Sequence, residues 1–163
     1  MNGVPSLWVG HPPIFDNLRQ NQREYPFYAF NPVFCDTGVA KYWRERTRRL
    51  QDATRLDDRT FAKRILVIEW FPYPSERRFY GPDKFEQSRE LLCPSQQYSF
   101  QLVCSFLTDT RVKVLGMRSK RYWVAVDKRF EKVPFLNSCQ NTRITPGNMS
   151  SGLFDEIVEI MKE

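Results

Sequence analysis

The sequence has no long apolar run and only one histidine. No stretch approaches the roughly 20 consecutive apolar residues that a membrane-spanning helix needs, and the first residues lack the charged-then-apolar order of a signal peptide. We therefore expect a cytoplasmic protein with no membrane partner. A catalytic triad would have to be built on His11, the single histidine, and nothing near it resembles a nucleophile elbow.

The four cysteines lack the spacing of a metal site. Cys35, Cys93, Cys104 and Cys139 include no CxxC pair, whereas zinc and iron–sulfur sites usually contain such pairs. We expect reduced, buried thiols, no bound metal and no cofactor.

Positive charge and aromatic side chains are both abundant. The 163 residues, enough for one domain, carry a net charge of +6, and 15% of them are aromatic. That combination suits a protein that contacts phosphates and stacks on bases. It predicts a nucleic-acid partner, with a protein partner as the alternative.

Strand-like and helix-like segments alternate along the chain. Apolar runs predict strands, and three-to-four spacing of apolar residues predicts helices. The expected strands are 6–10, 65–68, 111–117 and 133–138, and the expected helices are 38–53, 93–110, 119–130 and a terminal helix that Ser150 or Ser151 caps. The segment 25–32 is expected to be an extended loop. This alternation predicts an α/β fold with a parallel sheet covered by helices on both sides.

Polar groups gather where the predicted strands end. They lie in 10–13, 69–75, 118–120 and 137–143. The carboxyl ends of parallel strands meet at one edge of a sheet, where ligands bind. These loops are therefore expected to surround one ligand, although the aromatic residues after Glu69 could instead plug the end of the sheet.

Residue types suggest roles at that edge. The amides of Asn137, Gln140 and Asn141 can read the edge of a base, although a polar turn that satisfies its own backbone is the structural alternative. Phe27, Phe30, Trp70 or Phe71 can form a stacking wall, and Arg118, Lys120, Arg121 and Arg143 can hold phosphates, the alternative being solvated side chains.

Five phrases together resemble a known family. In order they are "YPFYAFNP", "VIEWFPYPS", "PSQQYSF", "GMRSKRYW" and "NTRITPGN". From about Leu7 onward the chain is similar to a poorly characterised bacterial or phage group within the uracil-DNA glycosylase superfamily. The resemblance implies one three-layer α/β/α domain with a short parallel sheet, a cleft for an extruded base, DNA rather than RNA as the nucleic acid, and a role in DNA repair.

The resemblance also implies which residues act. Gly10 and Pro13 match the first motif of the superfamily, but Pro12 stands where a polar residue positions water. Either His11 or Glu69 then takes that role, or activity is absent. The second motif falls within 137–141 without its usual His-Pro-Ser pattern, and the helices that normally precede the first strand are missing, which implies a shortened start.

The expected function is hydrolysis of the N-glycosidic bond of an extruded uracil or modified base. Positive charge develops on the sugar and negative charge on the base. Glu69 would stabilise the sugar, and Asn137, Gln140 or Asn141 the leaving base. The alternative is a non-catalytic module that binds nucleic acid or a protein after loss of the water-positioning residue. Hydrolysis of a free nucleotide is a third hypothesis.

Overall fold

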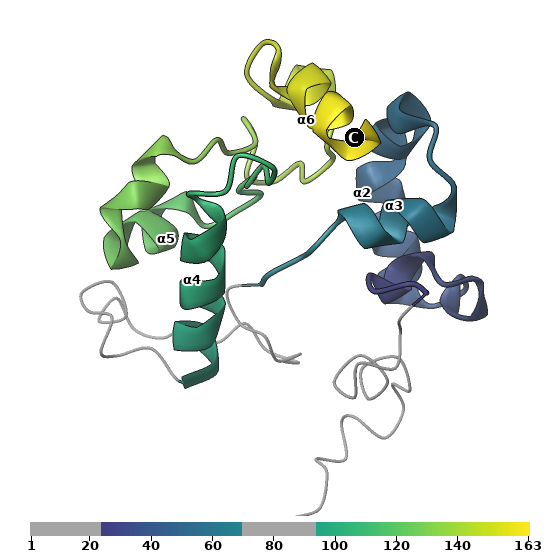
Figure 1. Ribbon diagram of the computed structural model, residues 1–163, viewed down its shortest axis with the longest axis horizontal. Coiled ribbons are helices and arrows are strands. Elements are labelled where there is room, and N and C mark those ends of the chain that lie inside the picture. Colours follow the sequence, from purple (N-terminus) through teal and green to yellow (C-terminus); the bar gives the residue numbers. More distant parts are fainter. Residues whose placement is uncertain (1–23, 70–93) are drawn as a thin grey trace, which may run out of the picture. The chain divides into compact units, whose positions relative to one another are not determined.

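The computed structural model describes residues 24–69 and 94–163, and in this part the protein is helical (Figure 1). These residues form five α-helices, short 3₁₀ turns and one isolated β-bridge, with no sheet. The prediction of a three-layer α/β/α fold is therefore wrong for the described part. The predicted strand 6–10, His11, Trp70, Phe71 and Cys93 lie outside the described residues.

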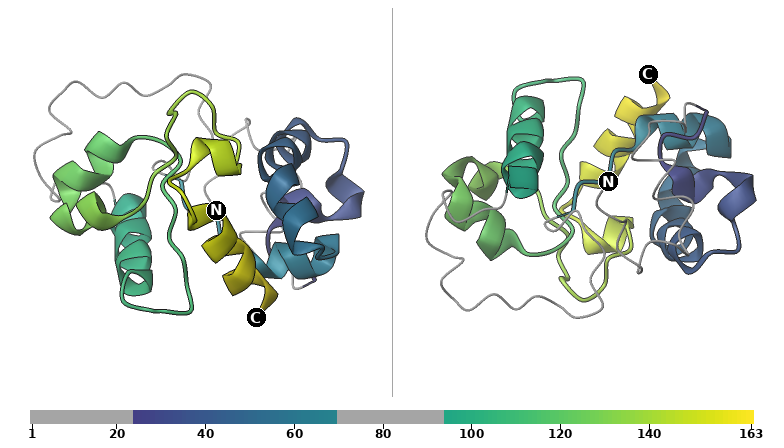
Figure 2. Two further views of the ribbon diagram at one scale, coloured as in Figure 1. Left: turned by 90° about the horizontal axis from the view of Figure 1, so that it is seen from above. Right: turned by 90° about the horizontal axis from the view of Figure 1, so that it is seen from below.

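The chain divides into two compact units, a first that runs to Val67 and a second from Ile68 to Met161. The first unit contains two α-helices and two 3₁₀ turns: η2 (Tyr28–Phe30), η3 (Pro32–Phe34), α2 (Gly38–Thr54) and α3 (Asp58–Arg64). Both α-helices pack on η2 (Figures 1 and 2). The fully buried rings of Phe30 and Phe61 meet there with centroids 4.8 Å apart.

Side-chain caps explain where the helices of the first unit begin. The Thr37 hydroxyl accepts a hydrogen bond from the Ala40 N–H at the start of α2, and Asp57 accepts one from the Thr60 N–H at the start of α3. Such caps satisfy N–H groups that have no partner within the helix. The predicted helix 38–53 is confirmed as α2. In place of the expected extended loop, 25–32 contains 3₁₀ turns.

The second unit is organised around an aromatic cluster. Its elements are α4 (Pro94–Phe106), α5 (Lys120–Val126), η6 (Lys128–Lys132), η7 (Pro146–Asn148) and α6 (Leu153–Lys162). The centroid of the Trp123 ring lies 4.6 Å from the centroid of the Phe100 ring and 5.1 Å from that of the Phe130 ring. This cluster holds α4, α5 and η6 together, and the predicted helices 93–110, 119–130 and the terminal one are confirmed in kind. The N-cap residue of α6 is Gly152 rather than a serine.

Two of the predicted strands meet at a single point. Gly116 and Phe135 form one parallel bridge, in which Gly116 donates to the Pro134 carbonyl and accepts from the Leu136 N–H, both at 2.8 Å. Pro134 has no N–H to extend the ladder. Nearby, Val114 and Val133 contribute to the aromatic cluster instead of a sheet.

The segment 65–68, predicted as a central strand, forms no strand in the described part of the chain. Ile65 has extended dihedral angles, and Ile68 packs against the aromatic cluster. Leu66 is 63% exposed, so this apolar run is only partly buried. Among the residues that the structure describes, no helix combines the length and apolar character needed to cross a membrane.

Candidate functional site

The predicted stacking residues of the first unit lie in its core. Phe27 is 8% exposed and Phe30 is fully buried. Phe27 packs edge-on against Trp43 at 5.4 Å between centroids, and Phe30 against Phe61. Protein therefore covers both rings in this conformation, and neither presents a face to a base.

The loop predicted to read a base is partly occupied by its own backbone. Asn141 accepts a hydrogen bond from the Arg143 N–H at 3.1 Å through its side chain, and its own N–H donates to the Ser138 hydroxyl. This is the polar turn that was the structural alternative for these residues. The side chains of Asn137 and Gln140 are exposed.

Asn148 holds this loop, and sequence analysis did not single it out as a site residue. Asn148 is buried, with 5% of its surface exposed. Its side-chain amide donates hydrogen bonds to the carbonyls of Asn141 and Arg143 and accepts one from the Ser138 N–H. Its backbone carbonyl also accepts from the Asn137 N–H at 2.9 Å. Its place after Pro146 and Gly147 was a turn signal that could have identified it.

Glu69 and Arg118 are two predicted site residues whose charges interact. Glu69 is an exposed residue. The surrounding protein nevertheless displaces enough water to raise the pKa of its carboxyl, and the positive charge of Arg118 lowers that pKa by a smaller amount. Desolvation disfavours the ionised form of a carboxyl, and a nearby cation favours it. The carboxyl therefore holds its proton to a higher pH than an ordinary glutamate.

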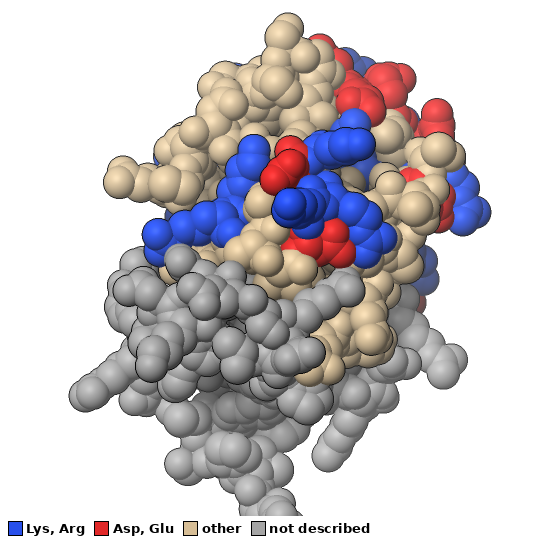
Figure 3. All heavy atoms as spheres, turned by 90° about the vertical axis from the view of Figure 1, so that its left-hand side faces the viewer, with Lys and Arg blue, Asp and Glu red and all other residues tan. Residues whose placement is uncertain are grey.

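Positive charge is concentrated in residues 111–143. This stretch holds nine Lys or Arg residues and two Asp or Glu residues, a net charge of +7 compared with +6 for the whole chain. Most of these cations are exposed. Figure 3 shows the face on which α5 lies, where Lys and Arg side chains gather around fewer acidic ones.

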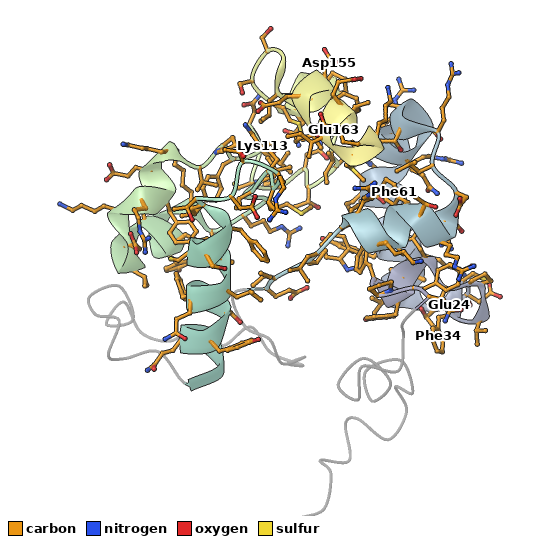
Figure 4. The ribbon with its side chains drawn as sticks, in the orientation of Figure 1. Glu24, Phe34, Phe61, Lys113, Asp155 and Glu163 are labelled. Atoms are coloured by element: carbon orange, nitrogen blue, oxygen red, sulfur yellow. The ribbon has the colours of Figure 1, made fainter. Side chains whose placement is uncertain are left out.

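Several of these cations already have partners. Arg111 binds Asp109 through two hydrogen bonds, and Arg129 binds Asp127 in the same way. Lys113, which is labelled in Figure 4, pairs with Glu156 of α6 at 2.5 Å.

Four other cations make no ion pair within the described part of the chain. They are Arg118, Lys120, Lys128 and Lys132, and we call them the unit 2 basic set; all four are exposed. Lys120 begins α5, and Lys128 and Lys132 are the first and last residues of η6. The aromatic cluster fixes these two elements next to each other, so the scaffold under the cations is well packed.

The three described cysteines, Cys35, Cys104 and Cys139, form no disulfide with one another. Cys104 is buried as expected, whereas Cys35 and Cys139 are exposed, so the prediction of burial is wrong for these two. Over residues 24–69 and 94–163, no group of three or more His, Cys, Asp or Glu residues could hold a metal ion.

Comparison with protein-family models, with curated proteins and with solved structures finds no significant match to this chain. The resemblance to uracil-DNA glycosylases stays a prediction, and the α/β/α fold that it implied is not the one observed in the described residues.

Proposed function

We propose that this protein binds nucleic acid through the unit 2 basic set. The observation that carries the proposal is the net charge of +7 in residues 111–143, within which four exposed cations make no ion pair in the described part. Unneutralised cations gain most from phosphates, because binding releases the counterions condensed on the nucleic acid.

The arrangement favours a polymer over a single nucleotide. The unit 2 basic set is spread over two consecutive elements and the loop before them and does not converge on one loop. Cations distributed in this way fit a row of phosphates and give affinity without base specificity. This supports the non-catalytic alternative of the sequence analysis, with nucleic acid as the partner.

The proposal is tested by the salt dependence of binding to a fluorescent oligonucleotide. The test variant is Lys128→Gln with Lys132→Gln. The control, Lys41→Gln with Arg111→Gln, changes the net charge equally but removes cations paired with Asp36 and Asp109. Each lost phosphate contact lowers the slope of log K against log salt by about 0.7 to 0.9.

We expect the slope to fall by about 1.5 in the test variant and to change much less in the control. If the slope fell equally in the two variants, net charge alone would determine binding, and the unit 2 basic set would not be the binding surface. Binding that does not respond to salt would overturn the proposal itself.

Base excision is a second candidate, favoured by the raised pKa of the Glu69 carboxyl. Groups that act as general acids or bases often have such shifted values. Strand cleavage by alkali, after incubation with oligonucleotides that carry uracil or modified bases, detects any abasic product. We expect Glu69→Gln to lower such activity at least about a hundredfold, and an unchanged rate would remove Glu69 from the mechanism.

A further inference from the structure

The cations of the first unit also divide into paired and unpaired residues. Arg44 is structural, since it donates to the carbonyls of Ala29 and Phe30 and pairs with Asp58 at 2.8 Å. The other paired cations are Arg46 with Glu45, Arg59 with Glu24 and Lys41 with Asp36. These residues stabilise the unit or are neutralised locally.

Five further cations of α2, its C-cap and α3 are exposed and make no ion pair in the described part of the chain. They are Arg48, Arg49, Arg55, Lys63 and Arg64, and we call them the unit 1 basic set. Asp52 is an exposed acidic residue among them on α2, and no ion pair joins it to them. Asp57 caps α3 through its side chain.

The unpaired cations of α2 lie opposite its buried face. Thr47, Leu50 and Thr54 are buried, whereas Arg48 and Arg49 are exposed. Arg48 and Arg55 are separated by about 10 Å along the helix axis, at 1.5 Å per residue, a span that covers more than one phosphate of a strand.

We propose that the unit 1 basic set is a second contact for the same nucleic acid, so that one strand is held by both units. This inference rests on the proposed function. Four of its five members are arginines, and a guanidinium group can bind a phosphate through two parallel hydrogen bonds and can stack on a base. Two linked contacts bind a long strand more tightly than either does alone, because the second contact forms within the complex.

The experiment compares three triple variants of the full chain that change the net charge equally. The first unit variant replaces Arg48, Arg49 and Arg55 by Gln, and the second unit variant replaces Lys120, Lys128 and Lys132 by Gln. The control replaces Lys41, Arg59 and Arg111 by Gln, each of which is exposed and paired in the structure. Circular dichroism melting establishes that each variant is folded.

Binding is measured by titration calorimetry with single strands of about 10 and about 40 nucleotides, one within and one well above the roughly 4 to 16 nucleotides that one small binding domain covers. We expect the wild-type protein to bind two short strands and the first unit variant to bind one. On the long strand, the first unit variant should lose at least about tenfold in affinity, while the control changes little.

The outcomes separate this inference from the proposed function. If the first unit variant behaves like the control while the second unit variant is weakened, the second contact does not exist and the proposed function stands. If only the first unit variant is weakened, the unit 1 basic set binds alone, which overturns both the unit 2 surface and the contact through two units. A wild-type protein that binds neither strand overturns both.

Discussion

Asn148 is the residue on which the loop from Ser138 to Arg143 depends. Its buried amide makes three hydrogen bonds to backbone groups of that loop. Asn148→Ala would leave those groups without these partners, at a cost of about 1 to 3 kcal/mol. We expect the free energy of unfolding in urea to fall by that amount.

Asn141→Ala is the matched control, because it removes an exposed amide from the same loop. Its single local hydrogen bond, from the Arg143 N–H, should contribute less than about 1 kcal/mol. If both variants were equally stable, Asn148 would not be what holds the loop.

Asp109 should titrate at unusually low pH. Its hydrogen bonds from the Arg111 guanidinium and backbone N–H lower the pKa of its carboxyl to about 2. The folded pKa lies below the unfolded one, so this contribution to stability is present above the ordinary carboxyl range and is lost as the pH falls towards 2.

Carboxyl chemical shifts followed by NMR would measure this pKa directly. We expect Arg111→Gln to raise the Asp109 pKa towards the ordinary aspartate range, because the first and largest cause of its shift is removed. Arg129→Gln is the control, since Arg129 pairs with Asp127. If the Asp109 carboxyl kept its low pKa in Arg111→Gln, the Arg111 guanidinium would not be the main cause of the shift.

Single residues of the candidate site were only partly predictable. Arg118 and Lys120 were predicted to contact phosphates and remain in the proposed surface. Phe27 and Phe30 were predicted to stack on a base, but they are core residues. In a segment without clear periodicity, sequence does not distinguish a buried aromatic ring from an exposed one, because both types of position use the same residues.

At the scale of elements, the bridge between Gly116 and Phe135 requires a residue without a side chain. A Cβ atom at position 116 would overlap the Phe135 ring. We expect Gly116→Ala to destabilise the protein by about 1 to 3 kcal/mol, as overpacking does, measured as a shift of the urea midpoint at unchanged slope.

Gly147→Ala serves as the control, because a Cβ atom at that position has nothing within 4 Å. The double variant Gly116→Ala with Phe135→Leu replaces the ring by a smaller side chain, and it should recover part of the stability lost in Gly116→Ala. If Gly147→Ala were as destabilising as Gly116→Ala, the close approach to Phe135 would not be the cause.

The elements show why the sheet was predicted wrongly. A short apolar run such as 65–68 has the same composition in a buried strand and in a connection that packs against helices. The neighbouring helix α3 went unpredicted, although Asp57 before it and Lys63 and Arg64 in its last turn are ordinary helix signals. The predicted strands 111–117 and 133–138 meet in one parallel bridge and form no sheet in the described part of the chain.

For the molecule as a whole, the sequence reveals how much charge there is but not which charges are available. The excess in residues 111–143 can be counted directly. Whether a cation such as Arg129 is already bound, or one such as Lys132 is not, depends on where the chain places its few carboxylates. This division between paired and unpaired cations is what the structure adds to the functional argument.

The pH dependence of binding follows from the same charges. Lys and Arg stay protonated near neutral pH, so affinity for nucleic acid should be constant between about pH 7 and 8. Below that range, Glu69 should take up its proton earlier than an ordinary glutamate because its pKa is raised. Protonation removes the negative charge that acts on Arg118, so we expect affinity to increase as the pH falls.

Glu69→Gln tests this sequence of events, since it imposes the uncharged state at every pH. We expect the variant to bind more tightly than the wild-type protein at neutral pH and to lose the part of the acid-dependent increase that Glu69 causes. An unperturbed histidine gains charge near pH 6.5, so His11→Gln, which removes the only histidine of the sequence, is measured beside it. An increase that survives in Glu69→Gln but disappears in His11→Gln would assign the pH dependence to the histidine and would leave Arg118 independent of Glu69.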